Sequence, residues 1–219
     1  MRAQPVHASG EHDNEPVPGL PARLPAGEHI LWQGAPQWRV LAVQAFHVRK
    51  VALYFGLMLL WRALSVWADS GAPLAVAAAL ALPLALAASG LGLLNLLAWL
   101  SARTTAYTLT NRRVVMRVGI VLSVSFNLPL SRLQAAALQP HSGGHGSIAL
   151  QLSGASRIAY LHLWPHARPW HLARPEPMLR AVAQAELLAR LLTDALGNSA
   201  RLPQLDQPLP QQRPQLRAA

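Results

Sequence analysis

The sequence contains no cysteine, which excludes a disulfide framework, a zinc–thiolate site and a cysteine nucleophile. Charge is also scarce, because 13% of the 219 residues are charged, against about 25% in an average soluble domain. The nine acidic residues are scattered, and no two have a spacing typical of a paired-carboxylate active site. Phosphate-binding glycine loops and Gly-x-Ser-x-Gly motifs are missing as well. The sequence therefore predicts a protein that is not an enzyme, carries no cofactor and lies partly in lipid.

Two apolar segments predict a transmembrane helical hairpin. They span about residues 51–68 and 74–100, and a membrane helix needs roughly 17–25 residues. Only DSGAP (69–73) connects them, and the second segment has no charged residue. Arg62 lies toward the end of the first segment, where its long side chain can reach the headgroups. The alternative for this first segment is a buried helix of a soluble protein.

Basic residues flank the open end of this hairpin, whereas the connecting turn carries Asp69 and no basic residue. Cytoplasmic loops of membrane proteins are enriched in Lys and Arg, so the asymmetry predicts a multi-pass protein with both termini in the cytoplasm. The net charge of +10 also favours an anionic surface nearby. The flanking basic residues are Arg39, Arg49, Lys50, Arg103, Arg112 and Arg113.

Small residues recur every four positions in the second segment. This spacing places them on one helix face, where another helix can approach closely. The face is expected either to dock a membrane helix of a partner or to pack against the first segment, and an alanine-rich sequence also produces such a stripe by chance. Its members are Ala77, Ala81, Ala85 and Ser89.

After residue 100 the hydrophobic period changes to two, which is typical of strands. A C-terminal helix is expected from about residue 175 to 196, with apolar positions that can close a small barrel. The predicted fold class is a membrane α+β protein, in which a transmembrane hairpin precedes an antiparallel β-barrel or sandwich (101–196) capped by this helix. An amphipathic juxtamembrane segment (28–50) and two disordered tails (1–27 and 197–219) complete the organisation. The expected strands cover residues 107–110, 114–118, 123–130, 147–152 and 157–164.

The hairpin AYTLTNRRVVMRVGI (106–120) carries three arginines close to the second span. Nucleic-acid binding is not expected, because the strands lack the aromatic residues on which bases stack. Arg112 and Arg113 follow the span by about ten residues, so they are expected to contact anionic headgroups. The alternative is the solvated face of a strand. The predicted membrane or partner contacts are Arg49, Lys50, Arg112, Arg113 and Arg117.

The segment WPHARPWH (164–171) adds Trp164 and Trp170 to these predicted contacts. Trp and Arg are enriched at the energetic centres of protein interfaces, but packing of the segment on the domain's own core is an equal alternative. The histidines of the predicted domain 101–196 could form a metal or tetrapyrrole site, but we favour the interpretation that they are surface residues. They are His141, His145, His162, His166 and His171.

The order of two spans followed by YTLTNRRVVMRVG resembles the bacterial pleckstrin-homology-like (PH-like) domains found on membrane anchors. Their Tyr-x-Leu-Thr-Asn-x-Arg signature matches Tyr107, Leu109, Thr110, Asn111 and Arg113. Segments 27–55, 107–120 and 161–180 further resemble photosynthetic-complex assembly proteins of purple bacteria, a similarity that covers about residues 11–196.

The resemblance implies a non-enzymatic assembly factor in the bacterial inner, photosynthetic membrane, with no catalytic residues to carry over. Its partners would be reaction-centre subunits, the core light-harvesting antenna and anionic lipids, and a homodimer stays open. The alternative is a membrane-anchored PH-like module that binds lipid or protein and is unrelated to photosynthesis.

Overall fold

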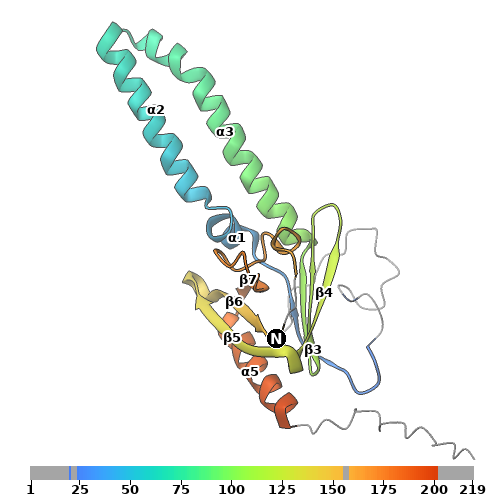
Figure 1. Cartoon of the computed structure of the whole chain (residues 1–219). Helices are drawn as coiled ribbons and strands as arrows, with labels where there is room; N and C mark the ends of the chain where they lie inside the picture. The colour runs from blue at the N-terminus through green and yellow to red at the C-terminus, as the bar shows by residue number, and fades with distance from the viewer. Residues whose placement is uncertain (1–19, 21–23, 155–157, 202–219) are drawn as a thin grey trace, which may run out of the picture.

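The computed structural model describes residues 20, 24–154 and 158–201 of the chain. A helical hairpin projects from one end of a β domain, which consists of two sheets and a C-terminal helix (Figure 1). We call the end that carries the hairpin the hairpin end and the opposite end the distal end. The tails at 1–19 and 202–219 lie outside the described residues, as do 21–23 and 155–157.

Three helices form the hairpin and its base. Helix α1 (Trp38–Gln44) is short and packs against α3 (Pro73–Thr104) through Leu41 and Ala42. Helix α2 (Val48–Ser70) begins after a sharp break, because His47 has left-handed backbone angles (φ 54°). Gly71 ends α2 in the same conformation, at no steric cost, and Pro73 starts α3 at the position where proline favours a helix. The predicted spans are therefore helices, somewhat longer than expected.

Both α2 and α3 are long and apolar enough to cross a membrane. A helix rises about 1.5 Å per residue, so the 23 residues of α2 extend about 34 Å, close to the roughly 30 Å thickness of a hydrocarbon core. Their large side chains are mostly exposed, including Trp61 at 77%. In water, such a surface would be strongly unfavourable.

The first sheet is antiparallel, with the order β1-β2-β3-β4, and every neighbouring pair is hydrogen-bonded. Its strands are β1 (Ile30–Gly34), β2 (Ala106–Thr110), β3 (Arg113–Val118) and β4 (Val124–Pro129). The alternating residues of 106–129 predicted three of these strands. The edge strand β1 was missed, since its partner β2 follows only after the whole hairpin.

The second sheet has the order β5-β6-β7, also antiparallel. It contains β5 (Leu133–Pro140), β6 (His145–Leu152) and β7 (Met178–Ala183), and 3₁₀ turns cover Leu130–Arg132 and Ser142–Gly144. Helix α5 (Ala185–Arg201) follows β7 directly. It packs on β5 and β6 and fills the space between the two sheets.

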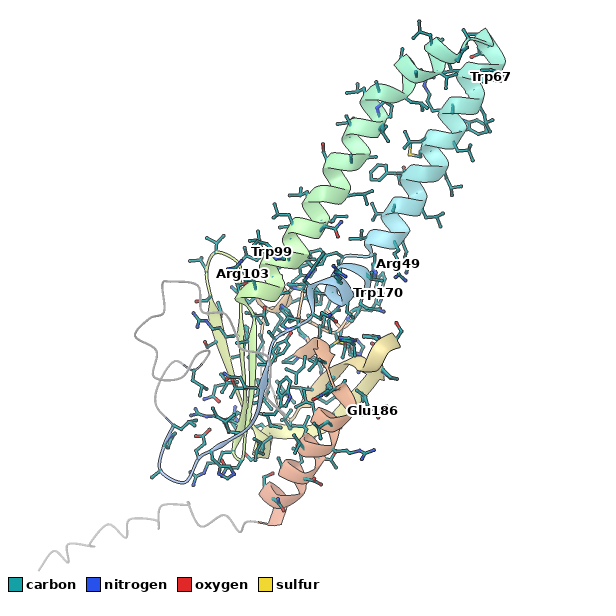
Figure 2. All side chains as sticks on the ribbon, turned by 180° about the vertical axis from the view of Figure 1, so that it is seen from behind. Arg49, Trp67, Trp99, Arg103, Trp170 and Glu186 are labelled. Carbon is teal, nitrogen blue, oxygen red and sulfur yellow. The ribbon has the colours of Figure 1, made fainter. Side chains whose placement is uncertain are left out.

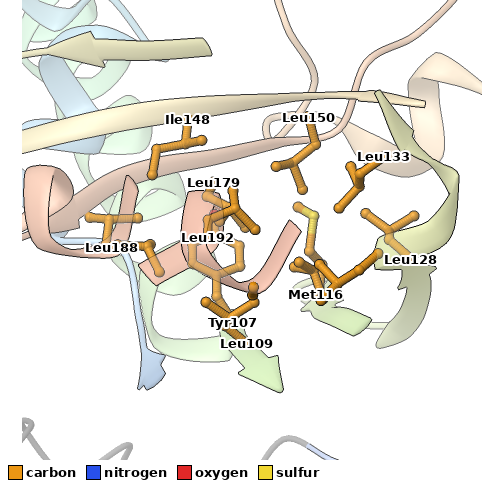
Figure 3. Packing of buried hydrophobic residues seen from close by; sticks show 14 residues of the cluster. Tyr107, Leu109, Met116, Leu128, Leu133, Ile148, Leu150, Leu179, Leu188 and Leu192 are labelled. Carbon is orange, nitrogen blue, oxygen red and sulfur yellow. The ribbon is translucent and has the colours of Figure 1, made fainter. Parts of the chain in front are cut away.

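The core of the β domain lies between the two sheets and α5 (Figure 3). Leu188, Leu192 and Ala195 of α5 recur at helical spacing and are at most 5% exposed. They meet apolar side chains from both sheets, so the helix closes the barrel as its stripe predicted. The labelled sheet residues of this core are Tyr107, Leu109, Met116, Leu128, Leu133, Ile148, Leu150 and Leu179.

Three local predictions are wrong. The expected strand 157–164 contains the short helix α4 (Tyr160–Leu163) instead. The C-terminal helix begins at Ala185 rather than near 175, because Met178–Val182 are buried and pair with β6 as strand β7. The same helix continues to Arg201, past the expected boundary of the C-terminal tail. Strand β5 (LQAAALQP) was missed because its small and polar residues lack a hydrophobic alternation.

Candidate functional site

Tryptophan and arginine side chains gather at the hairpin end. Figure 2 shows Arg49, Trp99, Arg103 and Trp170 there, with Trp67 at the tip of the hairpin and Glu186 below on α5. The guanidinium of Arg103 lies 5.2 Å from the ring centre of Trp99, a cation–π distance. Trp at both ends of an apolar helical hairpin, with Arg at one of them, is typical of membrane–water interfaces.

The predicted basic contacts divide between the two ends of the β domain. Arg49 and Lys50 are exposed in the first turn of α2, and Arg117 pairs with Ala106 beside the end of α3. Strand β2 runs away from α3 for five residues, about 17 Å, so Arg112 and Arg113 lie at the distal end. The expectation placed these two arginines near the headgroups from their short distance along the chain, but the structure carries them away from the end of α3. Their contact with lipid stays a prediction.

Arg113 has a partner within the chain. Its Nε donates to one oxygen of Glu28 at 2.7 Å and a terminal nitrogen donates to the other at 3.1 Å. The Glu28 side chain is 2% exposed, and the Thr110 hydroxyl also donates to it at 2.8 Å. Such a two-pronged pair fixes geometry as well as charge.

The rest of the Tyr-x-Leu-Thr-Asn-x-Arg signature is structural too. Asn111 donates to the carbonyl of Gly27 at 2.9 Å and accepts from the amide of His29 at 3.1 Å. Thr110 accepts from the amides of Arg112 and Arg113 and thereby closes the turn. The signature thus ties the β2–β3 turn to the residues that lead into β1.

The β3–β4 turn brings apolar residues to the hairpin end. Strand β3 pairs Arg117 with Ala106, so the following turn lies beyond the start of β2, beside α3 (Figure 1). Within it Val121 and Leu122 are 89% and 81% exposed. Gly119 permits the turn, because its φ of 128° is unfavourable for any residue with a side chain.

The segment 160–177, which we call the Trp segment, carries the two predicted tryptophans to the hairpin end. Trp164 packs edge-on against Phe46 of the α1–α2 junction, with ring centres 5.4 Å apart. Trp170 is 94% exposed, and its left-handed backbone (φ 65°) is uncommon for a large side chain. An ion pair of Arg168 with Glu176 at 2.8 Å holds the segment together. Trp164 is therefore partly a packing residue, whereas Trp170 projects from the segment almost fully exposed.

A buried polar cluster fixes this segment to the hairpin. His166 is fully buried, and its Nδ1 lies 2.6 Å from the hydroxyl of Tyr107. Its Nε2 lies 3.1 Å from the hydroxyl of Thr105 and 3.3 Å from that of Ser101, in the last turn of α3. One side chain thus joins α3, β2 and the Trp segment.

The hydrogen bonds also assign the protonation of His166. The Tyr107 oxygen already accepts from the amide of Arg180 at 3.2 Å, so its hydroxyl proton goes to Nδ1. Nε2 then carries the ring proton and donates to the Thr105 or Ser101 hydroxyl. Burial, with a smaller effect from the charge of Arg180, lowers the pKa of His166 to about 3. Burial raises the pKa of Tyr107, so both groups are neutral at physiological pH.

The expected surface role of the histidines is wrong for His166. No local pattern indicated the burial of His166, since its partners lie about sixty residues away in the chain. His141 bonds to Ser147 at 2.9 Å and His171 to the carbonyl of Pro169 at 2.9 Å. Within 20, 24–154 and 158–201, no group of three potential metal ligands comes together.

The small-residue stripe of α3 faces outward. Ala77, Ala81, Ala85 and Ser89 are all exposed, although α2 and α3 pack along each other. The alternative that this stripe packs against α2 is therefore wrong. The Ser89 hydroxyl donates to the carbonyl of Ala85 and needs no further partner.

Two antiparallel sheets closed by a C-terminal helix define a PH-like domain. A family model described as "Bacterial PH domain" matches residues 41–196, and the chain belongs to this family. It is also 40% identical over 196 residues to an uncharacterized 23.7 kDa protein in the puhA 5′ region of Rhodobacter capsulatus, covering 89% of this chain and 92% of that protein. No solved structure matches the chain.

Proposed function

We propose that the chain is an assembly factor for the bacterial photosynthetic reaction centre, of the PuhB type, and that it acts without catalysing a reaction. The relative near puhA supports this proposal by its photosynthesis-gene context. In this proposal the core antenna depends on the assembled reaction centre, so a secondary loss of antenna is expected.

In this proposal α2 and α3 cross the inner membrane, and the β domain and both termini lie in the cytoplasm. Arg49, Lys50 and Arg103 at the hairpin end, against Asp69 at the tip, support this orientation. The outward stripe of α3 then faces lipid or a membrane helix of a partner.

The observation that carries the proposal is the presentation of Trp170. Its side chain is almost entirely exposed, yet the segment that holds it is fixed by the buried His166 and by the Arg168–Glu176 pair. A rigidly held, exposed Trp suits a binding surface, because little side-chain entropy is lost when a partner covers it. Its place beside the first turn of α2 suits a partner that is itself embedded in the membrane.

Deletion of the gene in a photosynthetic host tests the function. We expect the spectroscopically measured reaction centre to fall several-fold, while total bacteriochlorophyll synthesis under inducing conditions is unchanged. Complementation with Trp170→Ala should restore less reaction centre than complementation with Trp67→Ala, a matched change at the tip of the hairpin. Normal reaction-centre levels in the deletion strain would instead favour a membrane-anchored PH-like module without a role in photosynthesis.

A further inference from the structure

A cavity of 270 Å³ lies between the α1–α2 junction, the Trp segment and β7. His47 lies at the junction and Arg180 comes from β7. The wall of the Trp segment is aromatic and apolar, and it consists of Tyr160, Trp164, Pro165, Pro169, Trp170 and Leu172. None of the lining residues is acidic.

Arg180 is an unusual residue for such a cavity. It is 8% exposed, and a terminal nitrogen donates to the carbonyl of Ala167 at 2.9 Å, but Nε has no hydrogen-bond partner. Neither the Arg113–Glu28 nor the Arg168–Glu176 ion pair involves Arg180. Burial lowers the pKa of this guanidinium. A buried charge without a counter-ion is costly, so an anion that enters the cavity would relieve a penalty already present in the free protein.

The position of the cavity restricts the source of this anion. His47 immediately precedes Val48, the first residue of the 23-residue apolar helix α2. If α2 crosses the bilayer, the cavity lies in the headgroup layer, where lipid phosphates are abundant. The apolar wall formed by Trp170 and Leu172, which are 94% and 66% exposed, then faces the glycerol and acyl region.

We propose that this cavity binds the phosphate of an anionic phospholipid, with Arg180 as its charged partner and the Trp segment covering the lipid backbone. The site differs from the predicted basic contacts, since Arg112 and Arg113 lie at the distal end. It depends on the membrane position of α2 but not on a role in photosynthetic assembly, so its failure would leave that function untouched.

The test uses the full chain, purified in a mild detergent and transferred to nanodiscs with equal amounts of phosphatidylglycerol and phosphatidylcholine. Lipid retained after detergent extraction is counted by native mass spectrometry. We expect the wild type to retain phosphatidylglycerol preferentially, and Arg180→Gln to lower this preference roughly tenfold. Trp170→Ala should lower it less. Trp67→Ala and Arg112→Gln should leave it unchanged, as controls for an interfacial Trp and a remote charge.

If Arg180→Gln does not fold, Trp170→Ala still tests the site, because Trp170 is exposed and contributes little to the core. Equal retention of the two lipids by the wild type would overturn the proposal, as would an unchanged preference in a folded Arg180→Gln. A third arm adds inorganic phosphate. Displacement of the lipid only at high concentrations fits a lipid site, whereas tight binding of free phosphate without lipid retention would overturn the lipid assignment.

Discussion

Nδ1 of His166 lies 2.6 Å from the hydroxyl oxygen of Tyr107, and both side chains are fully buried. Tyr107 is the second residue of β2, shortly after the end of α3, and His166 lies in the middle of the Trp segment. This contact therefore links the helical hairpin to the surface that presents Trp170. The first residue of the family signature has a definite role here, which is to hold a segment some sixty residues further along the chain.

The protonation of His166 predicts a pH dependence of stability. The folded state keeps the imidazole neutral down to a pKa of about 3, whereas an unfolded chain binds the proton near 6.5. Below pH 6.5 the unfolded state thus holds the extra proton, and the free energy of unfolding should fall by up to about 1.4 kcal/mol per pH unit toward pH 3. Above pH 6.5, His166 adds no pH dependence. Denaturation in micelles between pH 4 and 8 measures this slope.

His166→Gln is the matched control for this experiment, because its neutral side chain does not titrate. Its slope below pH 6.5 should be shallower than that of the wild type, since Arg180 and Tyr107 keep their charge states in this range. Imidazole ¹⁵N shifts at pH 5 give an independent readout, for which we expect a neutral ring protonated at Nε2. A ring protonated at both nitrogens at pH 5 would show that the assignment is wrong.

Tyr107→Phe separates the hydroxyl from the packing of the ring. The change leaves Nδ1 of His166 and the amide of Arg180 buried without partners, at about 1–3 kcal/mol for each unsatisfied group. We expect a lower apparent melting temperature and faster proteolytic cleavage within 160–177. Tyr54→Phe on α2 is the control, since Tyr54 is 59% exposed. Equal cleavage rates in the two variants would show that the Tyr107–His166 hydrogen bond does not hold the Trp segment in place.

The Glu28–Arg113 pair is expected to be structural rather than a contact with lipid. Arg113→Ala leaves the Glu28 carboxylate buried and unpaired, which costs about 3 kcal/mol once partial exposure of Arg113 is considered. Replacement of both, as Glu28→Leu with Arg113→Met, should recover most of this loss. Thermal unfolding of the three variants in detergent measures the effect. A double variant as unstable as Arg113→Ala would contradict the assignment.

The absence of cysteine makes the depth of single sites in the membrane measurable. Leu122→Cys and Arg112→Cys place one environment-sensitive label at the hairpin end and one at the distal end. In nanodiscs with brominated lipids, we expect quenching of the label at 122 and none at 112, because the proposed orientation brings the exposed Val121 and Leu122 next to the bilayer. Equal quenching at the two positions would exclude this orientation of the β domain.

The sequence predicted those elements whose signal is local. The helical hairpin, strands β2, β3, β4 and β6, and the capping stripe of α5 follow from runs and periods of neighbouring residues. Strand β1 was missed because it is defined by its pairing with β2, and the whole helical hairpin separates the two strands in the sequence. Strand β7 was taken for a helix start, since Pro175 and Pro177 precede buried residues that do not alternate.

The candidate site was predicted only in part, because most of its contacts join segments that lie far apart in the sequence. Trp170 could be singled out by composition, as could the basic residues at the start of α2. The burial of His166, the unpaired Arg180 and the Glu28–Arg113 pair each depend on segments that meet only in the folded chain. The positions of Arg112 and Arg113 relative to α3 were misjudged, because the five-residue strand β2 carries them away from that helix.

The proposed function requires that this protein holds the reaction centre during its assembly, and isolation of its complexes detects that contact. The affinity-tagged full chain is purified from solubilised membranes at intervals after reaction-centre synthesis is induced. We expect reaction-centre polypeptides to copurify early and to decline as assembly is completed. Trp170→Ala should lower their amount roughly tenfold relative to Trp67→Ala. Absence of reaction-centre polypeptides from the wild-type complexes at every stage would rule out the proposed role in assembly.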